Sequence, residues 1–140
     1  MKKKNKNNVR YNVNTTTKIK MSEKIEEFAS DYINLGDNTE ERQNLLNGAC
    51  TAWNIANLPE NLRDKALQQQ VEIYQNYNPG INITEAYLYN MKLLVDKKLK
   101  MFPELKKVIV HATIEPVDKD RYIILVSSTD DPKQFFKGKV

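Results

Sequence analysis

The stretch VIVHATIEPVDKDRYIILVS, at residues 108–127, decides the fold class of this chain because its apolar residues follow a period of two. On both sides of a polar turn at residues 115–120, apolar side chains alternate along the chain, which is the pattern of β-strands. The stretch therefore predicts an antiparallel β-hairpin near the C-terminus.

The predicted hairpin has apolar side chains on both faces. In its first strand, Val108 and Val110 share one face and Ile109 lies on the other, where Ile123 and Leu125 of the second strand join it. Two strands alone are only marginally stable in water. We therefore expect the hairpin to pack on helices and to gain a third strand.

Two sources for this third strand stay open. Residues 9–19 alternate in the same way and are rich in β-branched residues, which predicts a strand; a flexible tail is the alternative, because asparagines interrupt the pattern. A second copy of the chain is the other source, since uncovered apolar strands tend to associate. The asparagines make residues 9–19 a poor strand, so we favour a homodimer.

Upstream of the hairpin, apolar residues recur every three or four positions in four segments, which predicts four helices. Ser22 and Asn38 are suited to cap the first two helices, and Glu41 follows Asn38 at the spacing of a capping box. Trp53 lies on the apolar stripe of the second helix and is expected at the centre of the core. The expected helices span about residues 22–35, 38–58, 59–77 and 82–102.

The predicted inner faces of these helices consist of apolar and aromatic side chains. They comprise Met21, Ile25, Phe28, Ala29, Tyr32 and Leu35; then Leu45, Leu46, Ala49, Cys50, Trp53 and Ala56; then Leu62, Ala66, Leu67, Val71, Tyr74 and Tyr77; and finally Leu88, Met91, Leu94, Val95, Leu99 and Phe102. The helices and the hairpin together predict an α+β fold, in which a four-helix cluster packs on a small antiparallel sheet.

The length of 140 residues fits one domain, which we expect to cover residues 9–128. Residues 1–8 are polar and basic, with nothing to bury, and are expected to form a disordered arm. Residues 129–140 are expected to form a polar C-terminal tail.

Composition excludes several classes of protein. Apolar runs fall far short of the ~20 residues that cross a bilayer, and no apolar stretch follows the basic N-terminus, so a cytoplasmic protein with no membrane contact is expected.

One histidine, His111, and one cysteine, Cys50, supply neither a zinc site nor a Cys-His nucleophile. The four glycines are too dispersed for a phosphate loop. No metal or cofactor is predicted.

No catalytic residue is assigned. His111 is suited to act as a general base, a pH switch or a metal ligand, but a partly buried strand histidine with a hydrogen-bond partner is the favoured interpretation. The adjacent acidic pairs are Glu26 with Glu27, Glu40 with Glu41, and Asp130 with Asp131. Neighbouring residues on a helix point in different directions, so such pairs are more typical of solvated charge than of acid-base catalysis. An enzyme is the least favoured class.

Four tyrosines flank the predicted turn between the third and fourth helices: Tyr74, Tyr77, Tyr87 and Tyr89. Aromatic rings with polar tips are common in protein interfaces, although packing within the domain explains them as well. We therefore expect a small intracellular binding or regulatory protein that contacts another protein or a second copy of itself.

A nucleic-acid-associated accessory protein is the alternative. Residues 1–20 hold seven basic and no acidic groups, and lysines that neutralise phosphates give affinity that does not depend on sequence. The candidate phosphate contacts outside the basic arm are Lys92, Lys97, Lys98, Lys100, Lys106 and Lys107. Residues 21–90 have a net charge of −7, which would repel a polyanion, so protein binding is preferred.

Overall fold

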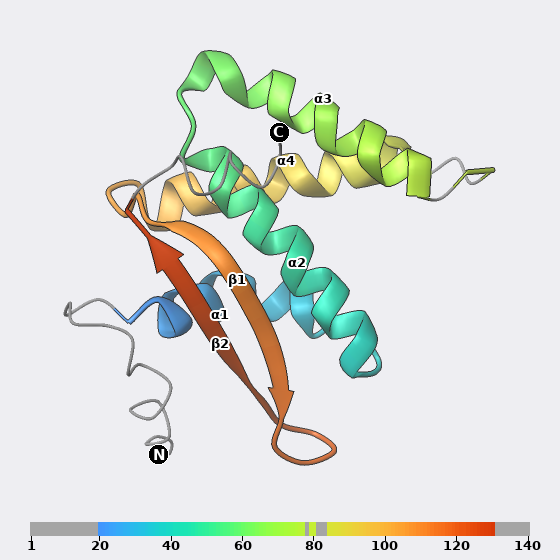
Figure 1. Ribbon diagram of the computed structural model, residues 1–140, viewed down its shortest axis with the longest axis vertical. Coiled ribbons are helices and arrows are strands. Elements are labelled where there is room, and N and C mark those ends of the chain that lie inside the picture. The colour runs from blue at the N-terminus through green and yellow to red at the C-terminus, as the bar shows by residue number, and fades with distance from the viewer. Residues whose placement is uncertain (1–19, 78, 81–83, 131–140) are drawn as a thin grey trace.

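The computed structural model describes residues 20–77, 79–80 and 84–130 of the chain (Figure 1). In chain order the elements are α1 (Met21–Ile33), α2 (Thr39–Ala56), α3 (Glu60–Tyr77), α4 (Thr84–Met101), β1 (Val108–Pro116) and β2 (Tyr122–Thr129). The helices pack on an antiparallel sheet formed by β1 and β2, which confirms the predicted α+β fold. The predictions for residues 1–8, for residues 9–19 and for the tail beyond Asp130 lie outside the described residues.

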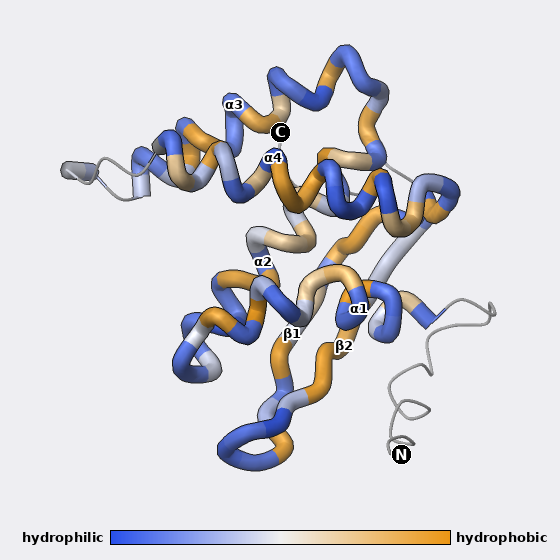
Figure 2. The backbone as a smooth tube through the Cα atoms, turned by 180° about the vertical axis from the view of Figure 1, so that it is seen from behind, coloured by the Kyte–Doolittle hydropathy of each residue, from blue (hydrophilic) through white to orange (hydrophobic). Residues whose placement is uncertain are grey.

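The helix α2 lies at the centre of the fold. It packs against β1, while α1 packs against β2, so these two helices cover the sheet. The helix α2 also contacts α4, and α3 packs on α4 (Figure 1). Figure 2 shows that the sheet is apolar along most of both strands, as a strand pair covered by helices requires.

The helix α1 begins at Met21, one residue earlier than expected. Its N-cap is Lys20, whose side chain makes no capping hydrogen bond, and Ser22 is buried in the first turn. The prediction that Ser22 caps this helix is therefore wrong. The helix ends at Ile33, so Leu35 falls in the connection to α2, where it is 73% exposed instead of buried.

The connection from α1 to α2 is tight. The predicted cap at Asn38 is confirmed, because its Oδ1 accepts a hydrogen bond from the Glu41 N–H at 2.9 Å. The Glu41 carboxylate in turn accepts from the N–H of Asp37, at 2.7 Å, rather than from Asn38. Gly36 is required here, because a Cβ at this position would lie 2.9 Å from the backbone nitrogen of Arg42.

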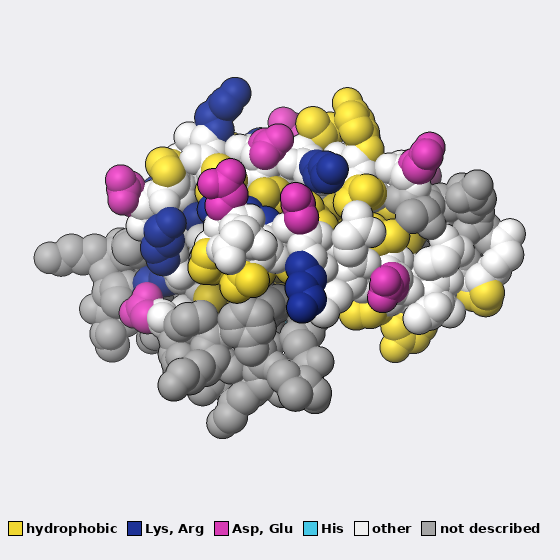
Figure 3. All heavy atoms as spheres, turned by 90° about the horizontal axis from the view of Figure 1, so that it is seen from above, with side chains coloured by type: hydrophobic (Ala, Val, Ile, Leu, Met, Phe, Trp, Pro, Cys, Tyr) yellow, Lys and Arg dark blue, Asp and Glu magenta, His cyan; other side chains and the backbone are white. Residues whose placement is uncertain are grey.

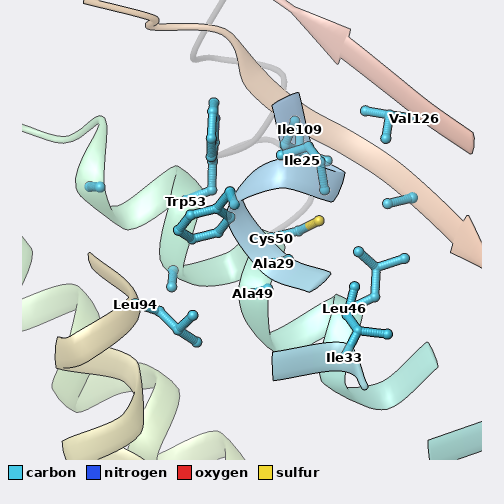
Figure 4. Packing of buried hydrophobic residues seen from close by; sticks show 14 of the residues in the cluster. Ile25, Ala29, Ile33, Leu46, Ala49, Cys50, Trp53, Leu94, Ile109 and Val126 are labelled. Atoms are coloured by element: carbon cyan, nitrogen blue, oxygen red, sulfur yellow. The ribbon is translucent and has the colours of Figure 1, made fainter. Parts of the chain in front are cut away.

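Trp53 is fully buried in the core, as predicted (Figure 4). Its ring meets Phe28 of α1 edge-on, with centroids 5.3 Å apart, and Phe102 beyond α4 at 5.7 Å. Its Nε1–H donates to the carbonyl of Lys107 at 2.8 Å, which satisfies the polar edge of the indole. Cys50 also faces the core, and burial raises the pKa of its thiol to about 12, so it is a small, unreactive apolar group.

The helix α3 buries less of its surface than was expected. Only Leu67 and Val71 are fully buried among its 18 residues. The expected burial of Leu62, Tyr74 and Tyr77 is wrong, since they are 43%, 36% and 82% exposed. The physical reason is that α3 packs mainly on α4 and less extensively on α2, so only a narrow stripe of the helix is covered.

The strands β1 and β2 pair along their length, with one irregularity. A β-bulge interrupts the register between Ile109 and His111. It places Ile109 on the buried side together with Val108 and leaves Val110 55% exposed. The prediction that Val108 and Val110 share a face opposite Ile109 is therefore wrong.

Two amide side chains of α2 close the outer edge of β1. Asn54 donates from Nδ2 to the Ile109 carbonyl at 2.9 Å and accepts the Ile109 N–H on Oδ1 at 2.8 Å. Gln43 donates from Nε2 to the Ala112 carbonyl at 3.0 Å and accepts the Ile114 N–H at 2.8 Å. Gln43 and Asn54 are eleven residues apart, about three helical turns, so they lie on the same face of α2. These amides take the place of a neighbouring strand.

Candidate partner-binding surface

The four tyrosines predicted to bind a partner divide into two pairs. Tyr74 of α3 and Tyr87 of α4 stack on each other, with ring centroids 4.0 Å apart and an interplanar angle of 11°. Tyr77 and Tyr89 instead point outward and are 82% and 64% exposed. The stacked pair joins α3 to α4, and the exposed pair is available to a partner.

A fifth tyrosine, Tyr32 of α1, lies near the stacked pair and was not among the predicted site residues. Burial, and then the proximity of Tyr74, raises the pKa of Tyr32. The pKa of Tyr87 is raised to about 12, first by burial and then by the nearby tyrosines Tyr32 and Tyr74. Helical periodicity predicted that Tyr32 lies on the inner face of its helix. It cannot predict which side chains of other helices Tyr32 lies near.

We call Ile73, Tyr77, Tyr89 and Leu93 the α3–α4 surface. Ile73 and Leu93 are 44% and 50% exposed, so all four side chains have large accessible areas. Within each helix the two residues are four apart, which places them on one face. Figure 3 looks onto α3 and shows apolar side chains among scattered acidic and basic ones. Exposed large apolar groups on two neighbouring helices are typical of interaction sites.

The lysines predicted to contact phosphate do not form one exposed stripe. Lys98 is fully buried, so the prediction that it contacts phosphate is wrong. Lys97 is half-buried, with Nζ 5.9 Å from the centre of the Phe28 ring, and Lys107 forms an ion pair with Asp130 at 3.0 Å. The lysines that remain exposed are Lys92, Lys100 and Lys106.

Lys98 serves instead as an internal link between three parts of the fold. Its Nζ donates to Asn57 Oδ1 at 2.6 Å and to the Leu105 carbonyl at 2.6 Å, and it lies 5.0 Å from the centre of the Trp53 ring. These contacts favour the charged form. Burial, and then the positive charges of neighbouring basic side chains, acts in the opposite direction and lowers the pKa of Lys98 to about 8.

We expect Lys98 to make the protein more stable as the pH rises. Its pKa is about 8 in the folded chain and 10.5 ordinarily, so between these values unfolding takes up a proton and the free energy of unfolding increases with pH. Lys98→Met keeps the apolar stem and removes the titrating group, so its stability should lack this increase. Urea unfolding of both proteins from about pH 7 to 10 measures the difference. Parallel pH profiles would contradict the assignment.

His111 is exposed on β1, and its Nε2 lies 2.8 Å from Thr113 Oγ1. The predicted hydrogen-bond partner is therefore present, although the ring is more exposed than expected. Of the acidic pairs, Glu26 and Glu27 are exposed, and Glu41 bonds the backbone before α2. No group of three or more His, Cys, Asp or Glu side chains that suits a metal ion occurs in the described ranges.

Within the same part of the chain, none of the helices combines the length and the apolar character that a membrane span needs. The exposed apolar side chains of α3 and α4 are the candidate site. No protein-family model matches the chain, and no curated protein and no solved structure matches it.

Proposed function

We propose that this chain is a small intracellular, non-enzymatic binding or regulatory protein that contacts a protein partner through the α3–α4 surface. The observation that carries the proposal is the exposure of its four large apolar side chains, each at 44% or more. Burying one such side chain favours a complex by roughly 1.5–3 kcal/mol, before the cost of association. Tyr77 and Tyr89 also keep a polar hydroxyl, a combination that is frequent in interfaces.

The arrangement of the helices supports this proposal. Figures 1 and 2 show α3 and α4 side by side, extending past α2 toward the turn that joins them. The stack of Tyr74 on Tyr87 holds the two helices together near this turn. The exposed side chains of the α3–α4 surface therefore stand on a braced pair of helices, which reduces the ordering cost of binding.

The charges around the α3–α4 surface favour a protein over a nucleic acid. Exposed acidic groups, Glu72, Glu85 and Asp96, occur on the same two helices as exposed Lys92. A surface that binds a polyanion needs a field of one sign, whereas a mixed rim around apolar side chains suits a protein interface. We therefore infer a different protein, with an apolar patch of its own, as the partner.

A photo-cross-linking amino acid placed at Tyr77 or at Tyr89 of the full chain tests this function in the source cell. Both positions should capture the same protein, and the matched exposed position Gln68 on α3 should not. The captured protein, once purified, should bind the chain, and a Tyr89→Ser, Leu93→Ser double variant should weaken binding about tenfold or more with little change in melting temperature.

Three results would contradict the proposal: equal capture from Gln68, capture from neither tyrosine, or an unchanged affinity of the double variant. A cross-link between two copies of the chain would assign the surface to self-association instead of to a different protein.

A further inference from the structure

A basic end of the molecule lies where α1 begins and α4 ends. We call residues 20–24 and 96–107 the basic pole, and we propose that it binds the phosphate backbone of a nucleic acid. None of its residues belongs to the α3–α4 surface. The inference therefore adds a second binding site and does not rest on the proposed function.

The two stretches of the basic pole are far apart in the sequence and meet in the fold. Lys24 of α1 places its Nζ 5.7 Å from the centre of the Phe102 ring. Lys97 of α4 places its Nζ 5.9 Å from the centre of the Phe28 ring in α1. Both rings pack on Trp53. Figures 1 and 2 show the start of α1 and the end of α4 on the same side of the molecule.

The charge of the basic pole has the opposite sign to that of the other described residues. The pole holds seven basic and three acidic residues, a net charge of +4. The other described residues comprise six basic and fourteen acidic ones, a net charge of −8. Residues 1–19, which precede the pole in the chain, hold six basic and no acidic residues. A polyanion is therefore attracted to this end of the domain.

Five lysines of the basic pole are accessible to a ligand. Lys98 is buried and Lys107 is paired with Asp130, so neither is counted as a phosphate contact. Periodicity along α4 could not show that lysines at the start of α1 join those at its end. The five accessible side chains, of which the first three are partly exposed and the last two fully exposed, are Lys20, Lys24, Lys97, Lys100 and Lys106.

The stability of the helices explains only some of these lysines. Lys97 and Lys100 lie near the C-terminal end of α4, where the helix dipole favours positive charge. Lys20 is the N-cap of α1 and Lys24 follows four residues later, at the end where the same dipole disfavours positive charge by ~0.3–1 kcal/mol. The Lys20 side chain makes no capping hydrogen bond in return. A bound anion would offset this cost.

The acidic part of the domain is too distant to prevent binding. Salt screens charges that lie more than ~8 Å apart under physiological conditions. Glu40 and Glu41 are in the first turn of α2, about 27 Å from its last turn, where Trp53 contacts the pole. β1 begins directly after the pole, so Asp118 and Asp120 in the hairpin turn lie beyond a strand of about 30 Å.

A negatively charged membrane is the competing ligand. Stable binding to a membrane surface combines basic groups with apolar side chains that enter the bilayer. Of the large apolar side chains that are exposed in the described part of the chain, none belongs to residues 20–24 or 96–107. A nucleic acid needs only contacts to its phosphates, which release counterions and give affinity for any sequence. The basic pole therefore suits a nucleic acid.

Fluorescence anisotropy of the full chain with two labelled probes tests the inference: a DNA duplex of about 20 base pairs and a single-stranded RNA of similar length. At least one probe should bind at about 50 mM salt, and its affinity should fall about 100-fold or more by about 200 mM, as roughly four phosphate contacts require. A probe of the same type with a scrambled sequence should bind within about twofold. The tighter probe identifies the kind of nucleic acid.

Paired substitutions in the full chain locate the site. Lys24→Gln with Lys97→Gln should weaken binding about tenfold or more and reduce the salt slope by about two. The matched control, Lys65→Gln with Lys119→Gln, removes the same charge from exposed positions outside the pole and should change the affinity by about twofold or less.

A second pair separates the loss of phosphate contacts from a loss of packing on the aromatic rings. Lys100→Gln with Lys106→Gln changes two exposed side chains and should also weaken binding about tenfold, with an unchanged melting temperature. The Tyr89→Ser, Leu93→Ser variant should bind as the wild type does, which keeps this result apart from the proposed function.

Four results would overturn the inference: no binding of either probe at low salt, an unchanged affinity of both pole variants, an equal loss in the matched control, or tighter binding to vesicles that contain phosphatidylserine than to either nucleic acid.

Discussion

The Trp53→Ala variant is expected to lose the cooperative thermal transition of the folded protein. Trp53 is fully buried, packs on Phe28 and Phe102, and donates a hydrogen bond to Lys107. Replacing a buried tryptophan by alanine costs ~3–5 kcal/mol, against a total stability of roughly 5–15 kcal/mol for a domain. The loss is enlarged because the ammonium of Lys98 would no longer lie over an indole ring.

Far-ultraviolet circular dichroism during heating measures this effect. Trp53→Phe is the matched control, because it keeps an aromatic ring between Phe28 and Phe102 but lacks the indole donor. It should melt cooperatively at a lower temperature than the wild type. A Trp53→Ala protein that melts within a few degrees of the wild type would show that Trp53 is not a central support of the core.

The elements of this fold could be predicted because hydrophobic periodicity is a local property of the sequence. The inner stripe of α2, which includes Leu46, Cys50 and Trp53, is buried as its spacing indicated. Leu62 and Tyr77 follow the same rule on α3 and are nevertheless exposed. Periodicity identifies which face of a helix is apolar, but how much of that face is covered depends on the neighbouring elements.

For Lys98 the error was the opposite one: its spacing indicated burial, but its residue type led to a prediction of exposure. Met91, Leu94, Val95 and Lys98 have the spacing of one buried helix face, and all four are buried. A lysine in the last turn of a helix is ordinarily exposed, where it favours the helix dipole. The acceptors that make its burial tolerable, Asn57 and the Leu105 carbonyl, are not recognisable from spacing alone.

The structure divides the four predicted tyrosines into two pairs. Tyr77 and Tyr89 are exposed as a partner surface requires, whereas Tyr74 and Tyr87 stack between the helices. Ile73 and Leu93, which complete the α3–α4 surface, were not identified, because a single apolar residue outside the inner stripe of a helix is common in any sequence. Only the joint exposure of the four residues distinguishes them.

The second large effect is expected for Asn54→Leu. Leucine resembles asparagine in size but can neither donate nor accept, so the N–H and the carbonyl of Ile109 would lose their partners at a buried site. Each buried polar group left unpaired costs ~1–3 kcal/mol, so the variant should lose ~2–6 kcal/mol of its free energy of unfolding. Urea titration monitored by circular dichroism measures the loss.

Two substitutions separate the loss of backbone pairing from the addition of an apolar side chain. Gln43→Leu removes the corresponding bonds to Ala112 and Ile114 at a part-buried site, where water can replace them, so its effect should be smaller. Asn61→Leu, on the exposed first turn of α3, should change stability by about 0.5 kcal/mol or less. An Asn54→Leu protein as stable as Asn61→Leu would show that the edge of β1 does not depend on this amide.

Asn54 also allows a test at a single amide of the sheet. Its Oδ1 accepts the Ile109 N–H, so in Asn54→Leu the Ile109 amide should exchange faster than in the wild type. Leu125 of β2 pairs with Thr113 inside the sheet, so exchange at its amide should increase only as far as global stability falls. The ratio of the two exchange rates therefore distinguishes a local opening of the β1 edge from general unfolding. An unchanged ratio would mean that this edge opens only together with the rest of the sheet.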